Sequence, residues 1–148
     1  MDNVIISIMN SKDLEDIKDI LSQEFDDFWT YNTFKSELEN PNSKYIVAKT
    51  QDKIIGFAGI WKVIDIAHIT NIVTAKAFRN KGIGSIMLSS LIELVQSEND
   101  INSITLEVNT NNIPAQKLYK KFGFKNAGLR KKYYNNTDDA IILTKKLK

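Results

Sequence analysis

The sequence predicts an α+β fold, in which a central, mixed but mostly antiparallel twisted sheet has helices on both faces. Apolar runs separated by turn residues between positions 43 and 75 are typical of three consecutive strands. Apolar residues at helical spacing in segments 11–25 and 82–96 indicate two amphipathic helices. The predicted order is β-α-α-β-β-β-α-β-α-β-β, which gives about seven strands, and we expect residues 1–148 to form a single domain.

The first strand is predicted over Val4–Met9. Asn10 or Ser11 is suited to cap the helix that follows, because both side chains can accept a hydrogen bond from a free backbone N–H. A second helix is predicted over Tyr31–Asn40, capped by the preceding threonine, and Pro41 stops it. The inward-facing positions of these two helices are Leu14, Ile17, Leu21, Phe25, Phe34 and Leu38.

The middle of the chain is predicted to be an antiparallel meander followed by a crossover. The three strands of the meander are Tyr45–Ala48, Ile54–Ile64 and Ile66–Thr74. A helix over Gly82–Gln96 then leads to an apolar strand over Ser103–Val108. A helix between two strands of one sheet implies a crossover connection.

The C-terminal third is predicted to contain one more helix and a closing hairpin. Asn112 and Pro114 are typical of a helix entrance, and Gly123 is typical of its end. Two strands, Phe124–Tyr134 and Ala140–Leu147, follow with a polar turn between them.

Bulk composition excludes several functional classes. Twenty Lys and Arg against 18 Asp and Glu leave a net charge of +2, so we expect neither nucleic acid nor membrane as a partner. With no Cys and one His, the chain lacks a disulfide framework and a thiolate nucleophile, and we expect no metal site. The apolar run near the N-terminus is too short for a signal peptide or a membrane span, so we expect a cytoplasmic protein.

A glycine loop between a strand and a helix is the strongest chemical signal. Arg79-x-x-Gly82-x-Gly84 brings backbone N–H groups and a helix start close to an anion, and Arg79 and Lys81 add positive charge. A pyrophosphate fits this arrangement. The alternative is that the two glycines only shape the helix entrance.

Other glycine-loop motifs do not fit the spacing. A Walker loop is absent, and Met87 occupies the position where a dinucleotide fingerprint needs a third small residue. Glu107 lies roughly where a ribose-binding acid would fall, but the antiparallel strands before the loop argue against a Rossmann fold.

Several spaced motifs together resemble the GCN5-related N-acetyltransferase (GNAT) superfamily, whose pyrophosphate motif is Arg/Gln-x-x-Gly-x-Gly/Ala. The similarity is greater to the branch that acetylates protein N-termini, including that of ribosomal protein S18. The motifs that carry this greater similarity are Trp29 with Phe34, His68-Ile69-x-Asn71-Ile72, Leu106-Glu107-Val108 and Asn112-x-x-Ala115-x-x-Leu118-Tyr119-x-x-x-Gly123-Phe124.

The resemblance implies that strands four and five splay apart and that acetyl-CoA lies between them. Its pyrophosphate would rest on the glycine loop, while the backbone of Ile72, Val73 and Thr74 would pair with the pantetheine arm and polarise the thioester carbonyl. The residues that the resemblance assigns to acetyl-CoA are Ile72, Val73, Thr74, Arg79, Asn80, Lys81, Gly82, Ile83, Gly84, Ser85, Asn112 and Tyr119.

The resemblance also implies a general base and a general acid. An N-terminal amine has a pKa of about 7.7 to 8.0 and is mostly protonated at neutral pH, so transfer needs a base. Glu107 is the implied base and Tyr119 the implied donor of a proton to the CoA thiolate. The alternatives are an ion-paired strand glutamate and a tyrosine that only packs in the core; helix capping alone would likewise explain Asn112.

Five further residues are candidates for the acceptor site. Trp29 and Tyr31 could form one wall of the groove, Tyr133 and Tyr134 the opposite wall, and His68 could relay a proton or line the groove. Core packing of the aromatic residues and a structural histidine are the alternatives.

The sequence departs from the N-terminal branch near the acceptor site. Asn109 stands where that branch usually has Arg, Asn111 where it has Ser, and Thr74 where it has an apolar residue. We expect a monomer or weak dimer that acetylates a protein N-terminus such as that of ribosomal protein S18. The alternatives are a small-amine acceptor (a polyamine, an amino acid or an aminoglycoside) and a non-catalytic CoA-binding module.

Overall fold

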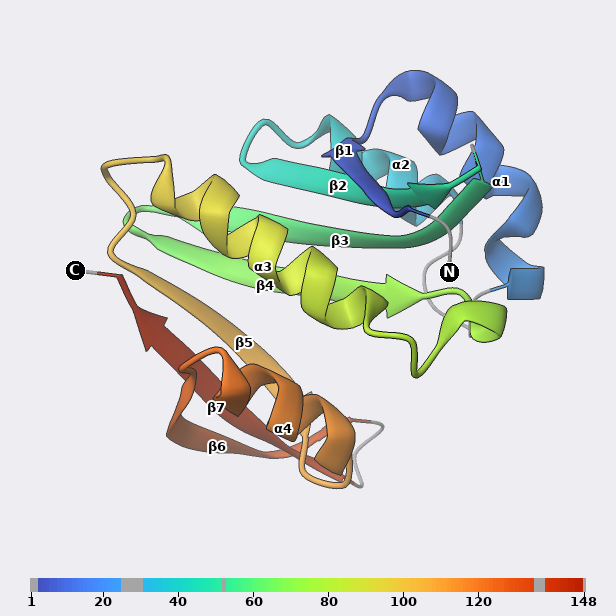
Figure 1. Cartoon of the computed structure of the whole chain (residues 1–148). Helices are drawn as coiled ribbons and strands as arrows, with labels where there is room; N and C mark the ends of the chain where they lie inside the picture. Colours follow the sequence, from blue (N-terminus) through green and yellow to red (C-terminus); the bar gives the residue numbers. More distant parts are fainter. Residues whose placement is uncertain (1–2, 25–30, 52, 135–137, 148) are drawn as a thin grey trace. The chain divides into compact units, whose positions relative to one another are not determined.

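The computed structural model describes residues 3–24, 31–51, 53–134 and 138–147, without the side chains of residues 19–24 and 132–134 (Figure 1). Its helices are α1 (Ser11–Glu24), α2 (Tyr31–Glu39), the short 3-10 helix η1 (Lys76–Phe78), α3 (Ile83–Gln96) and α4 (Ile113–Lys121). Its strands are β1 (Ile5–Ile8), β2 (Ser43–Thr50), β3 (Lys53–Val63), β4 (Ile66–Thr74), β5 (Ser103–Asn109), β6 (Lys125–Tyr134) and β7 (Asp138–Lys146). Apart from η1, the order of elements is the predicted one.

The seven strands form one sheet in the order β1-β2-β3-β4-β5-β7-β6. The pairs β1–β2, β2–β3, β5–β7 and β6–β7 are antiparallel. The pair β4–β5 is parallel, because the chain returns through α3 before it enters β5. These pairings confirm the mixed, mostly antiparallel sheet of an α+β fold.

The chain divides into two compact units. Unit 1 contains Met1–Trp61 and Thr70–Glu93, and unit 2 contains Lys62–Ile69 and Leu94–Lys148. A single domain over residues 1–148 stays a prediction.

In unit 1, α1 and α2 pack on one face of the sheet. The ring of Phe34 in α2 lies 4.9 Å from that of Phe57 in β3 and 5.3 Å from that of Tyr45 in β2, measured between centroids. Ile17 of α1 is fully buried in the same cluster. Burial of these apolar side chains stabilises this face by roughly 1.5–3 kcal/mol per residue.

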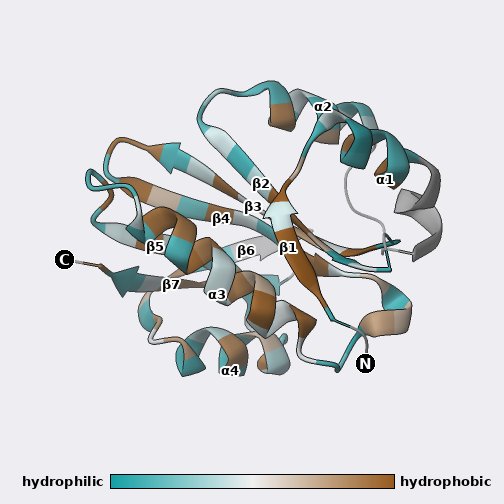
Figure 2. Cartoon of the chain, turned by 45° about the horizontal axis from the view of Figure 1, so that its top comes forward, coloured by the Kyte–Doolittle hydropathy of each residue, from teal (hydrophilic) through white to brown (hydrophobic). Residues whose placement is uncertain are grey.

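Helix α3 covers the opposite face of unit 1. A Cβ atom on Gly56 would lie 3.0 Å from Cε of Met87, so α3 sits close to the backbone of β3 there. Gly56 precedes Phe57 in the strand, and consecutive strand residues point to opposite faces. Ile83, Met87 and Leu91 of α3 are buried, and Figure 2 shows hydrophobic and hydrophilic residues interspersed along this helix.

The first turn of α1 has a reciprocal cap. The side chain of Asn10 accepts a hydrogen bond from the N–H of Asp13 at 2.8 Å, and the Asp13 carboxylate accepts one from the N–H of Asn10 at 3.0 Å. Lys49 of β2 pairs with the buried Asp13 carboxylate at 2.5 Å. Of the two cap candidates, Asn10 is therefore the one whose side chain performs this role.

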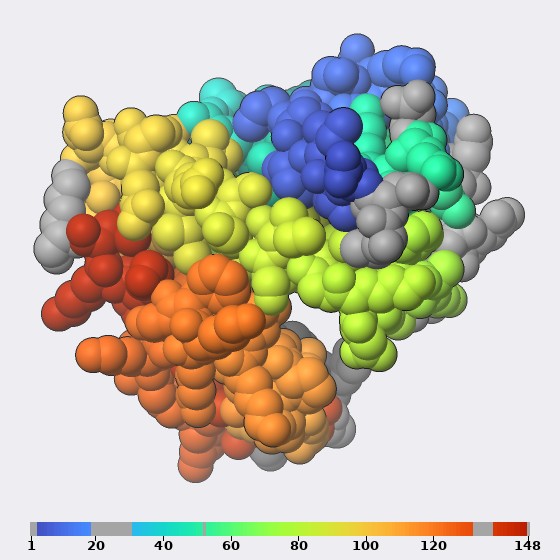
Figure 3. All heavy atoms as spheres, in the orientation of Figure 1, coloured from blue at the N-terminus to red at the C-terminus, as the bar shows by residue number. Residues whose placement is uncertain are grey.

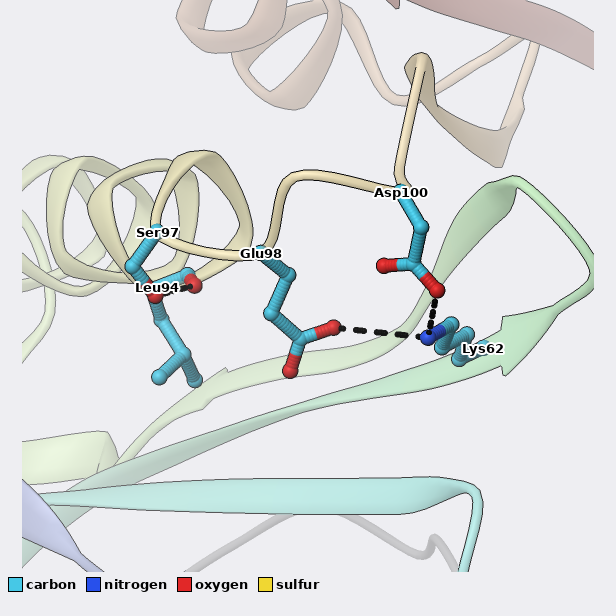
Figure 4. A network of polar contacts seen from close by, with 5 residues as sticks. All are labelled: Lys62, Leu94, Ser97, Glu98 and Asp100. Atoms are coloured by element: carbon cyan, nitrogen blue, oxygen red, sulfur yellow. Dashed lines mark hydrogen bonds and ion pairs between the residues drawn. The ribbon is translucent and has the colours of Figure 1, made fainter.

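A polar network in unit 2 holds the β3–β4 turn against the segment after α3 (Figure 4). The Lys62 ammonium lies 2.6 Å from the Asp100 carboxylate and 3.9 Å from that of Glu98. The hydroxyl of Ser97 donates to the carbonyl of Leu94 at 2.6 Å, close to the end of α3. The contact of Lys62 with Asp100 joins residues 38 positions apart in the chain.

Helix α4 has the predicted entrance and end. The Asn112 side chain accepts from the N–H of Ala115 at 3.2 Å, and Pro114 lies in the first turn. Gly123 follows the helix with φ +92°, a conformation that glycine adopts without a Cβ clash. Among the described helices, none has the length and apolarity needed to cross a membrane.

One strand end and one buried polar side chain are features that the local sequence pattern does not indicate. The strand predicted to reach Ile64 ends at Val63, because Ile64 turns into the left-handed region with φ 58°. In α4 the buried side chain is that of Gln116, whose amide donates to the carbonyls of Asn109 at 3.1 Å and Thr110 at 2.9 Å.

Candidate acetyl-transfer site

The predicted phosphate loop joins η1 to α3 within unit 1. Asn80 and Gly82 both have positive φ, 62° and 82°, so the chain turns sharply twice before the helix. The N–H of Ile86 donates to the carbonyl of Gly82 at 3.2 Å and starts the helical pattern. A Cβ on Gly82 would meet no atom within 4 Å, so the backbone there faces open space. Glycine is needed at this position for its φ, and the space beside it suits an anion.

Positive side chains surround the loop. The Arg79 side chain is exposed, and its Nε donates to the carbonyl of Thr74 at 3.3 Å, which ties the loop to the end of β4. The Nζ atoms of Lys53 and Lys81 lie 5.8 and 5.4 Å from the centre of the Phe78 ring. Figure 3 shows the segment around residues 76–82 (lime) at the molecular surface. Three cations beside a helix N-terminus give this loop the electrostatics of a phosphate site.

The other residues that were assigned to the loop lie in the first turn of α3. Gly84 and Ser85 are half-buried. The Ile83 side chain is 1% exposed and belongs to the core, so only its backbone can face a ligand.

Strand β4 leads to the loop, and its pairing with β5 covers only its first part. The register joins Ile66–His68 to Ser103–Thr105, whereas β4 continues to Thr74 and β5 to Asn109. The side chains of Ile72, Val73 and Thr74 are half-buried. The N–H of Ala75 donates to the carbonyl of Ile55 in β3 at 2.8 Å and so fixes the end of β4 in unit 1.

Glu107 lies on the polar face of β5 in unit 2. The apolar residues Ile104, Leu106 and Val108 are buried on one face, and Thr105 and Glu107 are half-buried on the other. Oε1 of Glu107 lies 3.1 Å from Nη2 of Arg130 in β6. The Glu107 side chain is 25% exposed and that of Arg130 is 54% exposed, so the pair borders solvent. The ion-paired alternative for Glu107 is thus present in the structure.

His68 lies on the same face of unit 2 as Glu107. His68 pairs with Thr105 of β5, where the pairing of β4 with β5 ends, and Glu107 lies two residues after Thr105 in β5. Paired residues of neighbouring strands share a face, as do residues two apart in one strand. His68 and Glu107 are therefore neighbours on one polar surface of the sheet.

Tyr119 is half-buried near the end of α4. Its ring lies 5.9 Å from that of Phe124 in an edge-to-face arrangement, and its carbonyl accepts from the N–H groups of Phe122 and Phe124 at 3.1 Å. Tyr119 thus has a packing role, and proton donation stays a prediction. Asn112, at the other end of this helix, caps it as described above.

The aromatic candidates for the acceptor groove are described only in part. The Tyr31 hydroxyl donates to the Glu15 carboxylate at 3.0 Å, and the Lys18 ammonium lies 5.1 Å from the Tyr31 ring, so this residue links α2 to α1. Trp29 lies outside the described residues. Tyr133 and Tyr134 belong to β6, but their side chains also lie outside the description.

Sequence reasoning missed three polar contacts near these elements. Arg130 meets Glu107, Gln116 meets the end of β5, and Tyr45 meets Asn71 of β4 at 2.9 Å. Asn71 was noticed only as part of a motif, and Arg130 is one of several basic residues in its strand. The sequence signal that could have indicated the Tyr45 contact is a tyrosine in one strand and a glycine in the next, because the glycine leaves room for the ring.

Known proteins share both the sequence pattern and the fold. The profile of the Acetyltransferase (GNAT) family matches residues 14–124. A Bacillus subtilis relative is 39% identical over 137 residues, which cover 91% of this chain and 90% of the relative. The [ribosomal protein bS18]-alanine N-acetyltransferase of Haemophilus influenzae is 33% identical over 145 residues, covering 94% and 96% of the two chains.

A solved structure agrees with these relatives. The ribosomal-protein-S18-alanine N-acetyltransferase from Escherichia coli superposes with a TM-score of 0.87 at 28% identity, covering 98% of this chain and 94% of that one. The range matched by the family profile includes the glycine loop, residues 79–84. This chain therefore belongs to the GNAT family of acetyltransferases.

Proposed function

We propose that this protein transfers the acetyl group of acetyl-CoA to the α-amine of the N-terminal alanine of ribosomal protein bS18. The observation that supports acetyl-CoA as the donor is the loop Arg79–Gly82, which lies between the end of β4 and α3. Two residues with positive φ and three cations lie there beside the N-terminus of a helix. The observation that carries the acceptor is the match over more than nine-tenths of the chain to enzymes named for bS18 alanine.

The loop residues would hold the pyrophosphate of acetyl-CoA through backbone N–H groups of Gly82, Gly84 and Ser85, with Arg79 and Lys81 adding charge. Backbone groups of Ile72–Thr74 would pair with the pantetheine arm. Acetyl-CoA supplies an activated thioester carbonyl, and a donor of this kind needs no metal.

Glu107 would act as the general base. It takes a proton from the acceptor ammonium, and the neutral nitrogen attacks the thioester carbonyl carbon. A C–N bond forms, the C–S bond breaks, and the nitrogen releases its second proton to solvent as the amide forms. The CoA thiolate takes a proton for which Tyr119 is the proposed donor, and the tyrosine regains its proton from solvent. Arg130 keeps the Glu107 carboxylate on the polar face of β5.

The acceptor amine would reach Glu107 on this polar face of β5. His68 neighbours Glu107 there and would line the groove, while Trp29, Tyr31, Tyr133 and Tyr134 are proposed as its walls. We further propose a cytoplasmic monomer or weak dimer, since ribosomal proteins are made in the cytoplasm.

Acetyl transfer from labelled acetyl-CoA tests the proposal. The panel contains a peptide with the bS18 N-terminus, the same peptide with a blocked α-amine, a lysine peptide and spermidine. We expect label only where the N-terminal α-amine is free. Preferred transfer to spermidine would instead support the small-amine alternative, and binding of CoA without transfer would support a non-catalytic module.

Substitution of the proposed base and acid separates their roles. Glu107→Gln should lower kcat by about 10² to 10⁴, the usual contribution of a general base, with little change in the KM for acetyl-CoA. A loss of less than about tenfold across pH would remove Glu107 from this role. Tyr119→Phe keeps the ring contact with Phe124 and therefore tests the hydroxyl alone.

A further inference from the structure

Tyr45 reaches from β2 to β4 across the intervening strand β3. Its partner in β3 is Gly59, and a Cβ atom on that glycine would overlap the Cε2 and Cζ atoms of the tyrosine ring. The ring therefore lies over the backbone of β3, in the space that a side chain would otherwise fill. Tyr45 is 2% exposed, and the ring of Phe34 in α2 packs against its ring.

The hydroxyl of Tyr45 forms hydrogen bonds within a group of three polar side chains. Nδ2 of Asn71 donates to the Tyr45 hydroxyl at 2.9 Å and to Oγ1 of Thr70 at 3.3 Å. The two hydroxyls lie 3.3 Å apart, within hydrogen-bond distance. Burial raises the pKa of Tyr45 to about 12, so the hydroxyl keeps its proton at neutral pH. An unbonded buried hydroxyl is costly, and these partners remove that cost.

Two consecutive residues of β4 contact the same hydroxyl. Side chains of consecutive residues in a regular strand point to opposite faces, so Thr70 and Asn71 cannot both meet Tyr45 in an unbroken alternation. The strand is thus locally irregular at these two residues, and irregularities of this kind re-aim the residues that follow. The residues that follow are Ile72–Thr74.

We propose that Tyr45 is a positioning residue for the donor-binding end of β4. Its hydroxyl holds Thr70 and Asn71 and thereby sets the direction of the peptide groups of Ile72–Thr74. This inference rests on the proposed function, because it assigns acetyl-CoA to those peptide groups. A packing role alone would be filled by a phenylalanine, whose ring could lie over Gly59 in the same way.

The kinetic experiment uses Tyr45→Phe, Asn71→Leu and the double variant. Each single change should lower kcat/KM for acetyl-CoA about tenfold. This loss is smaller than the loss of about 10²-fold in rate that a displacement of bound substrate by about 1 Å can cause. The KM for the acceptor peptide should change by less than about twofold. Because both residues act through one hydrogen bond, the double variant should lose little more than either single one.

Thr50→Val is the matched control. Thr50 lies in the same strand β2, and its buried hydroxyl has no hydrogen-bond partner among the described residues. Removing it changes a buried hydroxyl without touching the Tyr45 group, so kcat/KM should stay within about twofold of the wild type. Losses that multiply in the double variant, or an equal loss in Thr50→Val, would overturn the inference.

Hydrogen exchange gives a readout that does not require activity. The amides of Ile72–Thr74 should exchange faster in Tyr45→Phe than in the wild type or Thr50→Val, at a temperature well below unfolding. Unchanged exchange would overturn the inference even if the variant loses activity. A wild-type protein that transfers no acetyl group would overturn the proposed function, while the exchange rates would still decide whether Tyr45 holds β4.

Discussion

At the scale of single residues, the buried hydroxyl of Tyr45 makes the free energy of unfolding decrease at alkaline pH. A tyrosine in an unfolded chain has a pKa of about 10, whereas burial raises the pKa of Tyr45 to about 12 in the fold. Between these values the unfolded chain releases a proton that the folded chain keeps. This contribution to stability is therefore complete below about pH 10 and is lost as the pH rises through about 12, and it amounts to about 3 kcal/mol.

Urea unfolding at a series of pH values between about 8 and 12 measures this loss. The free energy of unfolding of Tyr45→Phe should fall less steeply over this range, since the variant lacks the group. Other tyrosines and lysines titrate in both proteins and cancel in the difference. Parallel curves for the two proteins would contradict the assigned pKa.

The ion pair of Arg130 with Glu107 should contribute little to stability. Its guanidinium side chain is 54% exposed, and exposed pairs are worth about 0–1 kcal/mol because water and salt screen them. We expect Arg130→Ala to lower the free energy of unfolding by less than about 1 kcal/mol in urea titrations. Lys131→Ala removes an equal charge from the neighbouring exposed position and serves as the control. A larger loss in Arg130→Ala alone would show that the pair supports the hairpin itself.

At the scale of elements, Gly59 is predicted to be intolerant of any side chain. A methyl group would overlap the Tyr45 ring, and overpacking of this kind costs about 1–3 kcal/mol. Thermal or urea unfolding of Gly59→Ala should show this loss. The same substitution in a Tyr45→Ala background should cost less, because the ring is absent. An equal cost in both backgrounds would assign the effect to the strand backbone instead.

Local patterns were sufficient to predict most elements. The periodicity of Ile66–Thr74 gave both ends of β4, and Asn112 with Gly123 marked the two ends of α4, since caps and turn residues act within a few positions. The left-handed turn at Ile64 could not be predicted, because β-branched residues rarely adopt it.

Long-range contacts were the part that sequence could not supply. The glycine loop was recognisable because its chemistry lies in six consecutive residues. The pairing of Glu107 with Arg130 depends on the register of β5, β7 and β6, and the contact of Tyr45 with Asn71 spans 26 positions. No periodicity within one element encodes such pairs.

At the scale of the whole molecule, we expect the two units to unfold together. Three elements, β3, β4 and α3, each have residues in both units. Neither unit therefore contains any of these three elements completely. Urea unfolding followed by far-UV circular dichroism and by fluorescence of Trp61, in a Trp29→Phe background, should give coincident transitions. Two separate transitions would instead show that the units are independent and would contradict a single domain over residues 1–148.

The ring of Tyr45 over Gly59 also constrains how this chain can diverge. A lineage that acquires a side chain at position 59 must first replace Tyr45, and losing that ring leaves a void beneath Phe34. Each single step passes through a less stable ancestor, so the two positions are expected to change rarely and in a fixed order. Descendants of this protein that keep the tyrosine should keep the glycine as well.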